Sequence, residues 1–247
     1  MAQQARRRKK RSALFAPIAF ALIVIALFFG ISVFFRVNNI EVEGNSFYTD
    51  EEIVAASGIE RGDNLFFINR FSVIARIYAR LPYVERASIR RSLPNRLVIE
   101  VTESSALAYV VTEDDIWAID RNCKLLTRVG ENELGGLIRV VGLSPLDPEQ
   151  GAIVSAGEAE SPKVSYLSAI LKQISDLELR EDVTWIDLSN VSNPSFDYQG
   201  RFTVKLGTGE NVEYKFQCLL SAVEALEPGD RGTLDLSIDR QAHLTYD

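Results

Sequence analysis

The longest uninterrupted apolar pattern lies near the N-terminus. Residues 13–35 contain 23 consecutive uncharged positions that are rich in Ile, Leu, Val, Phe and Ala. As a helix they would span roughly 35 Å, enough to cross a hydrocarbon core of about 30 Å. A cleavable signal peptide has a shorter core and a small-residue exit, whereas Phe34 and Phe35 stand here. A buried helix of a soluble protein suits this stretch less well, so the pattern predicts an uncleaved transmembrane anchor.

The next 70 residues predict a unit with the order β-α-α-β-β. Its first helix starts at a capping box formed by Thr49 and Glu52 and ends at Gly58. Asn69 is the expected N-cap of the second helix. The apolar face of that helix has the spacing i, i+3, i+4 and i+7 and consists of Ile74, Ile77, Tyr78 and Leu81. The predicted elements are strand 37–43, helix 50–57, helix 70–81, strand 84–91 and strand 97–101.

The remaining residues predict a β-rich unit with interposed helices. A turn at 120–123 joins two strands of an opening meander, and residues 130–162 predict loops with short strand pieces. Ser161 and Pro162 are the expected N-cap and first residue of a helix. The predicted strands are 107–111, 116–119, 124–129, 183–188, 196–198, a hairpin of 202–206 with 211–214, and a closing strand 234–238; the helices run to 177 and over 216–226. The fold class is therefore α+β.

Charge is distributed unevenly along the chain, whose formal net charge is −7. Six basic residues, Arg6–Arg11, precede the apolar segment, and Arg36 alone follows it closely. Basic residues stay on the cytoplasmic side of a membrane helix, so we expect a cytoplasmic N-terminus and an extracytoplasmic bulk. Residues 104–247 carry 12 basic and 24 acidic side chains. This acidic balance argues against nucleic-acid binding, which requires a surplus of Lys and Arg.

Candidate catalytic chemistry is sparse. The single histidine, His243, is expected in a solvated tail, a poor position for a rigid catalytic base. Cys123 and Cys218 are 95 positions apart and do not have metal-ligand spacing; two free thiols are expected, with one disulfide as the alternative. Adjacent acids occupy predicted turns and caps. We therefore expect no enzyme activity, no metal, no cofactor and no small-molecule substrate.

Several motifs resemble the FtsQ/DivIB family of bacterial cell-division proteins, whose first outer domain is a POTRA module. The segments that carry the resemblance are 37–45, Gly58 with 62–69, 81–87, 94–103, 119–123, 185–189, Leu206-Gly207 and 234–237. The chain departs from the family pattern at Ala106, where the family usually has proline, and at Cys123, which replaces a turn glycine. We expect Asn122 to adopt the left-handed conformation in its place.

The resemblance implies a non-enzymatic scaffold at the division septum that binds FtsB/DivIC-type and FtsL-type single-pass proteins and helps control septal peptidoglycan synthesis. It also implies that the last strand offers an open edge, with Leu234, Asp235, Leu236, Ser237 and Ile238, and Tyr246 as an aromatic anchor. An edge already covered by a neighbouring strand is the alternative. Helix 70–81 and the strand after it are weaker candidates for a second recruitment surface.

The expected domains are a cytoplasmic basic tail (1–12), a transmembrane signal anchor (13–35), a POTRA domain (36–104) and an FtsQ-type β-domain (105–247). Two other functions remain open, a membrane-anchored extracytoplasmic sensor and a POTRA-type transport or assembly component. The short predicted tail argues against the first because it is too small for a folded output domain. The second would normally need several POTRA copies or a partner barrel.

Overall fold

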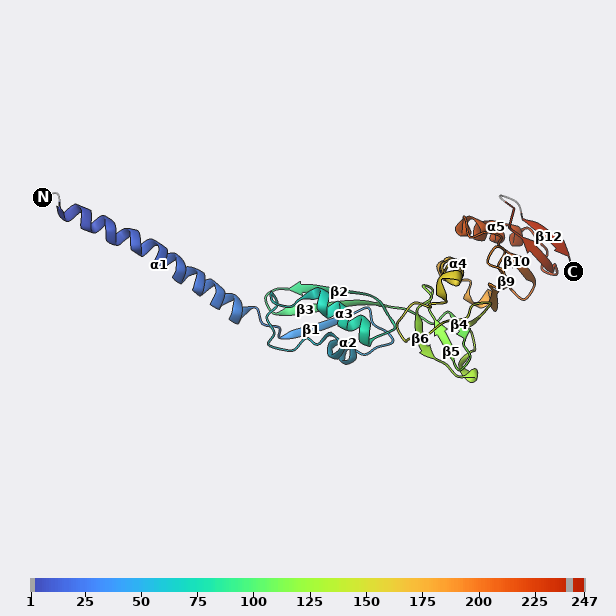
Figure 1. Cartoon of the computed structure of the whole chain (residues 1–247), viewed down its shortest axis with the longest axis horizontal. Coiled ribbons are helices and arrows are strands. Elements are labelled where there is room, and N and C mark those ends of the chain that lie inside the picture. The colour runs from blue at the N-terminus through green and yellow to red at the C-terminus, as the bar shows by residue number, and fades with distance from the viewer. Residues whose placement is uncertain (1–2, 239–241, 247) are drawn as a thin grey trace. The chain divides into compact units, whose positions relative to one another are not determined.

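The computed structural model describes residues 3–238 and 242–246 (Figure 1). Residues 1–2 of the predicted basic tail, and residues 239–241 and 247 of the predicted second domain, lie outside the described residues, as do the side chains of the basic run. The chain divides into two compact units, Met1–Arg80 with Val84–Glu103, and Leu81–Tyr83 with Ser104–Asp247. Each unit is described by itself.

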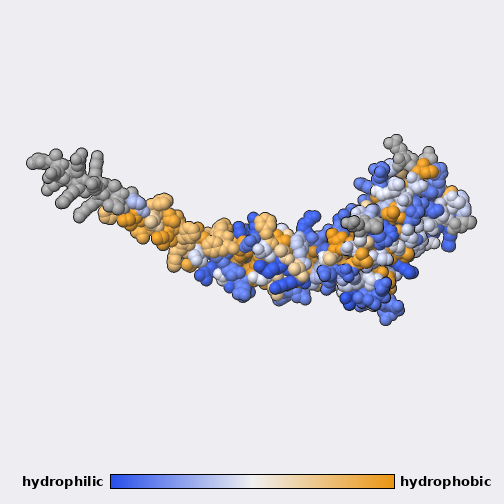
Figure 2. Space-filling view, viewed as in Figure 1, coloured by the Kyte–Doolittle hydropathy of each residue, from blue (hydrophilic) through white to orange (hydrophobic). Residues whose placement is uncertain are grey.

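The first unit begins with the long helix α1, Gln3–Phe34. The 18 residues Pro17–Phe34 have a mean hydropathy of 2.7, and none of them is buried. Apolar side chains cover this part of the helix (Figure 2). In length and composition α1 can therefore cross a membrane once.

The rest of the first unit has the predicted β-α-α-β-β order. The sheet order is β1-β3-β2, in which the central strand β3 is parallel to β1 and antiparallel to β2. Helix α2 packs on β1 and on α3, and α3 packs on β2. The elements are β1 Asn39–Glu43, α2 Asp50–Ser57, α3 Arg70–Arg80, β2 Val84–Ser92 and β3 Arg96–Glu103.

The buried face of α3 differs by one position from the predicted one. Ile77 and the following Leu81 are buried as predicted. Val73 is the other buried residue of the helix, whereas Ile74 is half-buried and Tyr78 is exposed. Tyr78 is 41% exposed, and its hydroxyl accepts a hydrogen bond from the Ala87 N–H at 3.1 Å. A tyrosine at the rim keeps its polar group accessible, so the smaller Val73 takes the inward position.

The ends of α2 confirm the expected caps. Thr49 Oγ1 accepts a hydrogen bond from the Glu52 N–H, and the Thr49 N–H donates to the Glu52 carboxylate at 2.9 Å. Gly58 ends the helix in the left-handed conformation, with φ 64°.

A second carboxylate secures the loop before α2. The Glu103 side chain, at the end of β3, accepts hydrogen bonds from the N–H groups of Ser46, Phe47 and Tyr48 and from the Ser46 hydroxyl. Partial burial alone would raise the pKa of Glu103, but the hydrogen bonds outweigh it and hold this pKa below its ordinary value. The ionised carboxylate therefore joins the 46–48 loop to the sheet.

The second unit contains a nine-stranded mixed sheet with the order β12-β11-β10-β9-β8-β7-β4-β5-β6. The pairs β4–β7, β7–β8 and β10–β11 are parallel, and the others are antiparallel. Two helices pack against each other and share one apolar core with the strands. The strands are β4 Ala108–Val111, β5 Ile116–Ile119, β6 Leu125–Arg128, β7 Ile138–Val141, β8 Trp185–Asp187, β9 Ser195–Tyr198, β10 Phe202–Lys205, β11 Gly232–Asp235 and β12 His243–Tyr246, and the helices are α4 Gly157–Asp176 and α5 Val212–Glu224; short 3-10 turns occupy Glu131–Glu133 and Arg180–Asp182.

Three local predictions in this unit are wrong. Residues 211–214 begin α5 instead of a strand, because Val212 joins Phe216 at i+4 on the buried helix face. Helix α4 begins at Gly157, so Pro162 lies inside it rather than at its first position. In the turn after β5, Cys123 itself has φ 60°, and Asn122 is not left-handed.

The Cys123 turn is stabilised by the fully buried Asp120. Its carboxylate accepts hydrogen bonds from the N–H groups of Asn122 and Lys124 and from the Ser104 hydroxyl, each at 2.8 Å. These three hydrogen bonds compensate the cost of burying the carboxylate. They also hold the turn in which Cys123 adopts a left-handed conformation that glycine would adopt more easily.

We predict that Glu103→Gln lowers the free energy of unfolding of the first unit by about 1 kcal/mol, because an amide is a weaker acceptor and the carboxylate is only partly buried. Because the pKa of Glu103 is lower in the folded state than in the unfolded state, the carboxylate stabilises the fold at a pH above its unfolded-state pKa. This stabilisation is lost as the pH falls through the folded-state pKa. The variant should therefore show a shallower acid destabilisation than the parent in urea titrations at several pH values. Equal pH profiles would contradict this role of Glu103, and Glu60→Gln, at an exposed position of the same unit, is the matched control.

Candidate functional site

The two edge strands of the nine-stranded sheet, β6 and β12, differ in how their outer backbone groups are paired. At the β6 end, the Leu125 N–H donates to the Ala152 carbonyl at 2.8 Å, and the Gly151 N–H donates to the Leu125 carbonyl at 2.7 Å. Segment 151–154 therefore covers that edge at the start of β6, beside Lys124 and Leu125. At the other end, β12 pairs with β11 on one side, and within the described chain no strand pairs with its second side. The outer edge of β12 is the open edge of the sheet.

The hydrogen-bond pattern shows which residues of β12 face outward. The Gly232 and Leu236 N–H groups donate to β10 and its neighbour Arg201, so Thr233 and Asp235 direct their backbone groups toward β12. Their register partners are Thr245 and His243. In an antiparallel pair the alternate residues point away. The N–H and C=O groups of Leu244 and Tyr246 therefore face the open edge.

The predicted site residues fall into two groups. Leu234 and Leu236 are 1% and 2% exposed and belong to the core, whereas Ser237 and Ile238 are exposed and Asp235 is half-buried. Tyr246, 64% exposed, lies in β12 rather than in a tail. The expectation that 234–238 forms the last strand is wrong, because β11 ends at Asp235 and β12 follows it.

Sequence reasoning missed β12, which also contains His243. Its signal is weak because the strand has four residues, of which Leu244 is the one that packs partly against the core. His243 therefore lies in a strand, not in the solvated tail that we expected. It stands opposite Asp235 in the β11–β12 register.

The charge of Asp235 is stabilised where β11 ends. Partial burial alone would raise its pKa, but hydrogen bonds from Ser237 and the positive charges of Lys205 and His243 outweigh this effect and lower the pKa. The Ser237 N–H donates to Asp235 Oδ1 at 2.8 Å. This bond turns the chain directly after β11 toward the connection to β12.

Two glycines allow the C-terminal strands to approach the sheet. A Cβ atom on Gly232, which has φ 147°, would meet the carbonyl oxygen of Thr245 in β12. A Cβ atom on Gly207 would meet the backbone of Ser237. The carbonyl groups of Gly207 and Thr208 also accept hydrogen bonds from the Tyr166 hydroxyl in α4, at 3.1 and 2.8 Å. The edge strand β12 and Ser237 before it are therefore closely packed against the rest of the sheet and α4.

The two cysteines lie outside the open sheet edge, and neither is part of a metal-binding cluster among the described residues. Burial and the charge of Asp120 raise the pKa of Cys123 to about 12, so its thiol is protonated at neutral pH and is a poor nucleophile. Both cysteines are free, with Cys123 buried and Cys218 half-buried. Among the residues that the structure describes, no group of three His, Cys, Asp or Glu side chains is arranged to hold a metal ion.

Comparison with known proteins gives one match to a family model and several similar relatives. Residues 35–104 match the family model "POTRA domain, FtsQ-type". A cell division protein DivIB of Clostridium botulinum strain Hall is 29% identical over 210 residues, covering 83% of this chain and 80% of the relative. A cell division protein FtsQ of Corynebacterium glutamicum is 26% identical over 158 residues, covering 61% and 70%.

The structure is that of an α+β protein with an apolar N-terminal helix, a POTRA-type domain and a β-rich C-terminal domain, and the relatives that it matches are named cell-division proteins. Over most of its length the chain is similar to the FtsQ and DivIB cell-division proteins, and residues 35–104 match the FtsQ-type POTRA model. The expectations of fold class and family are therefore confirmed.

We predict that Gly232→Ala displaces β12 from β11, because the added methyl group occupies the place of the Thr245 carbonyl. The amides of Thr245 and His243 should then exchange hydrogen much faster than in the parent. Gly229→Ala, at an open position in the preceding turn, is the matched control and should leave that exchange unchanged. Protected β12 amides in the Gly232 variant would contradict this packing.

Proposed function

We propose that this protein is a non-enzymatic scaffold at the division septum whose outer β12 edge binds a segment of an FtsB/DivIC-type protein. An FtsL-type protein joins the same complex, and the assembly helps to control septal peptidoglycan synthesis. The observation that carries the proposal is the asymmetry of the sheet, which is covered at β6 and open at β12. The identity of the partners is inferred from the resemblance to FtsQ and DivIB proteins.

Strand addition fits the chemistry of this edge. The backbone groups of Leu244 and Tyr246 form hydrogen bonds with an incoming strand and fix its register. The exposed side chains of Tyr246, Ile238 and Ser237 supply contacts beyond the backbone, with Tyr246 as an aromatic anchor. Leu234 and Leu236 contribute from the core by holding β11 in place. Asp235 takes part through the turn that it forms with Ser237.

The proposed topology places the basic tail, residues 1–12, in the cytoplasm and residues 13–35 across the membrane. The POTRA domain, 36–104, and the β-domain, 105–247, then lie outside the cytoplasm. The run of basic residues before the helix supports this orientation. Helix α3 and the strand after it remain a second candidate surface for recruitment within the POTRA domain.

We predict that Tyr246→Pro weakens binding of a purified FtsB/DivIC-type partner more than Tyr246→Ser does. Both variants remove the aromatic ring, but proline also removes the N–H group that faces the open edge. One lost hydrogen bond of about 1 kcal/mol corresponds to a further loss of roughly fivefold in affinity. Both substitutions are at an exposed position, so circular dichroism should show the parent fold.

Equal affinities for the two Tyr246 variants would contradict backbone pairing at this edge. Thr245→Pro is the positive control, because it removes an N–H group that faces β11 and should release β12 itself. Substituting Leu234 or Leu236 would not serve, since a loss of binding could follow from a disrupted core.

We also predict that an N-terminal fluorescent fusion of the full chain forms a midcell band in dividing cells. A uniform membrane signal would contradict the scaffold proposal and favour an extracytoplasmic sensor or a POTRA-type transport or assembly component. A variant that ends at residue 104, and so lacks the β-domain, is the matched comparison. Retention of its midcell band would assign localisation to the POTRA domain and leave partner binding to the β-domain.

A further inference from the structure

The C-terminal end of α1 is tied to one loop of the POTRA domain. Asn64 Nδ2 donates a hydrogen bond to the Ile31 carbonyl at 2.9 Å, and its Oδ1 accepts one from the Phe66 N–H at 3.0 Å. The Leu65 N–H donates to the Phe35 carbonyl at 2.9 Å, and Arg36 forms a β-bridge with Asn64. The rings of Phe35 and Phe66 meet edge to face, 5.0 Å apart. The loop therefore starts beside the last helical turn.

The length of the apolar segment places this turn relative to a bilayer. Residues Pro17–Phe34 extend about 27 Å as a helix, close to the hydrocarbon thickness of about 30 Å. Ile31 must then lie within about one helical turn of the hydrocarbon boundary when the helix spans the membrane. Because Asn64 is bonded to Ile31, the 64–67 loop lies in the headgroup region of the leaflet at that end.

Large aromatic side chains are exposed at this level. Phe67 and Phe71 are 70% and 85% exposed, and Phe66 is also exposed. Asn69 Oδ1 caps the start of α3 by accepting hydrogen bonds from the Phe71 and Ser72 N–H groups, which holds Phe71 in the first turn. Three exposed phenylalanines in one short segment are costly in water. They suit the boundary between headgroups and acyl chains.

Exposed basic side chains flank these rings. Arg36, Arg61 and Arg70 are exposed around the loop, and the Arg91 guanidinium lies 6.0 Å from the centre of the Phe66 ring. The nearby Asp63 carboxylate accepts a hydrogen bond from the Glu60 N–H, so it is engaged within its own loop. Arginines beside aromatic rings complement the phosphate groups of a bilayer surface.

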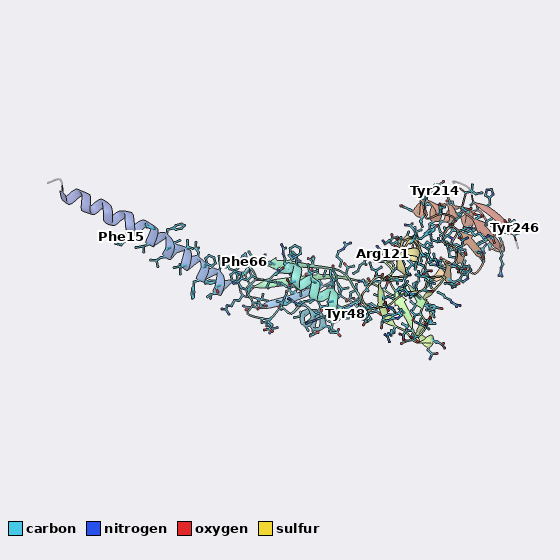
Figure 3. The ribbon with its side chains drawn as sticks, viewed as in Figure 1. Phe15, Tyr48, Phe66, Arg121, Tyr214 and Tyr246 are labelled. Atoms are coloured by element: carbon cyan, nitrogen blue, oxygen red, sulfur yellow. The ribbon has the colours of Figure 1, made fainter. Side chains whose placement is uncertain are left out.

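We infer that Phe66, Phe67 and Phe71 form a membrane-docking patch that inserts into the leaflet at the C-terminal end of α1. The patch fixes the POTRA domain against the bilayer at a second point beside the anchor. Figure 3 shows Phe66 at the end of the domain that adjoins α1, and Tyr48, next to Phe47, at the opposite end. This inference rests on the proposed membrane anchor but not on the proposed binding partners.

The test uses the full chain reconstituted in vesicles of equal parts phosphatidylcholine and phosphatidylglycerol, with or without bromine on the acyl chains. Phe67→Trp and Phe71→Trp introduce reporters at the patch. Phe47→Trp is the matched control, because it is also an exposed phenylalanine of the same domain. The parent protein gives the background from Trp117 and Trp185. Fractional quenching at 67 and 71 should exceed that at 47 by about twofold or more, because interfacial rings reach the upper acyl chain.

A further reporter, Phe28→Trp within α1, separates the possible failures. Quenching at 28 together with equal quenching at 67, 71 and 47 would overturn the docking patch and leave the anchor intact. Absence of quenching at 28 would overturn both. A photo-crosslinking residue at 67 in living cells should label lipid; labelling of one discrete protein instead would identify the patch as a protein interface and overturn the inference.

Discussion

The architecture of the β-rich domain depends on one constraint, that the backbone groups at each end of an open sheet must find partners or face water. The β6 end meets it internally, through the bonds that Leu125 makes with Gly151 and Ala152. The β12 end leaves the outward groups of Leu244 and Tyr246 available. Exposed edges invite uncontrolled pairing, and proteins usually cover or shorten them. β12 is short, with four residues, so its edge offers limited pairing without a specific partner.

The features that place this edge are distributed along the sequence. Gly232 admits the Thr245 carbonyl, and Gly207 admits the turn after β11. Tyr166 and Lys215 donate to the carbonyl group of Thr208, at 2.8 and 2.7 Å, so both helices are joined to the loop that follows β10. The edge strand therefore rests on contacts from α4, α5 and β11. A change at one of these positions can alter partner binding without touching the partner, which is why exposed positions report on recognition more cleanly.

Sequence patterns predicted the POTRA domain well because its signals are local. The capping box at Thr49 and Glu52 lies within a few residues, and the structure confirms it. The strand expected over 97–101 also forms, although Val98 is buried together with Leu97 and Ile99. The second domain was harder. Residues 211–214 alternate like a strand, yet the i+4 contact of Val212 and Phe216 makes them helical. The β12 strand is visible only through its pairing with β11, which is a tertiary contact that no four-residue pattern specifies.

The same distinction applies to the functional surfaces. Tyr246 was predicted from family resemblance, whereas the orientation of its backbone toward the open edge follows from the register alone. Residues 65–68 form an apolar run in the sequence, and the exposure of its phenylalanines follows only from the packing, which buries Leu65 and leaves Phe67 outside. Both surfaces thus consist of groups that the fold itself leaves exposed, namely backbone hydrogen-bonding groups beside Tyr246 at the β12 edge and phenylalanine rings in the POTRA domain. A membrane anchor gives each a reason, because it holds one beside lipid and raises the effective concentration of membrane-bound partners for the other.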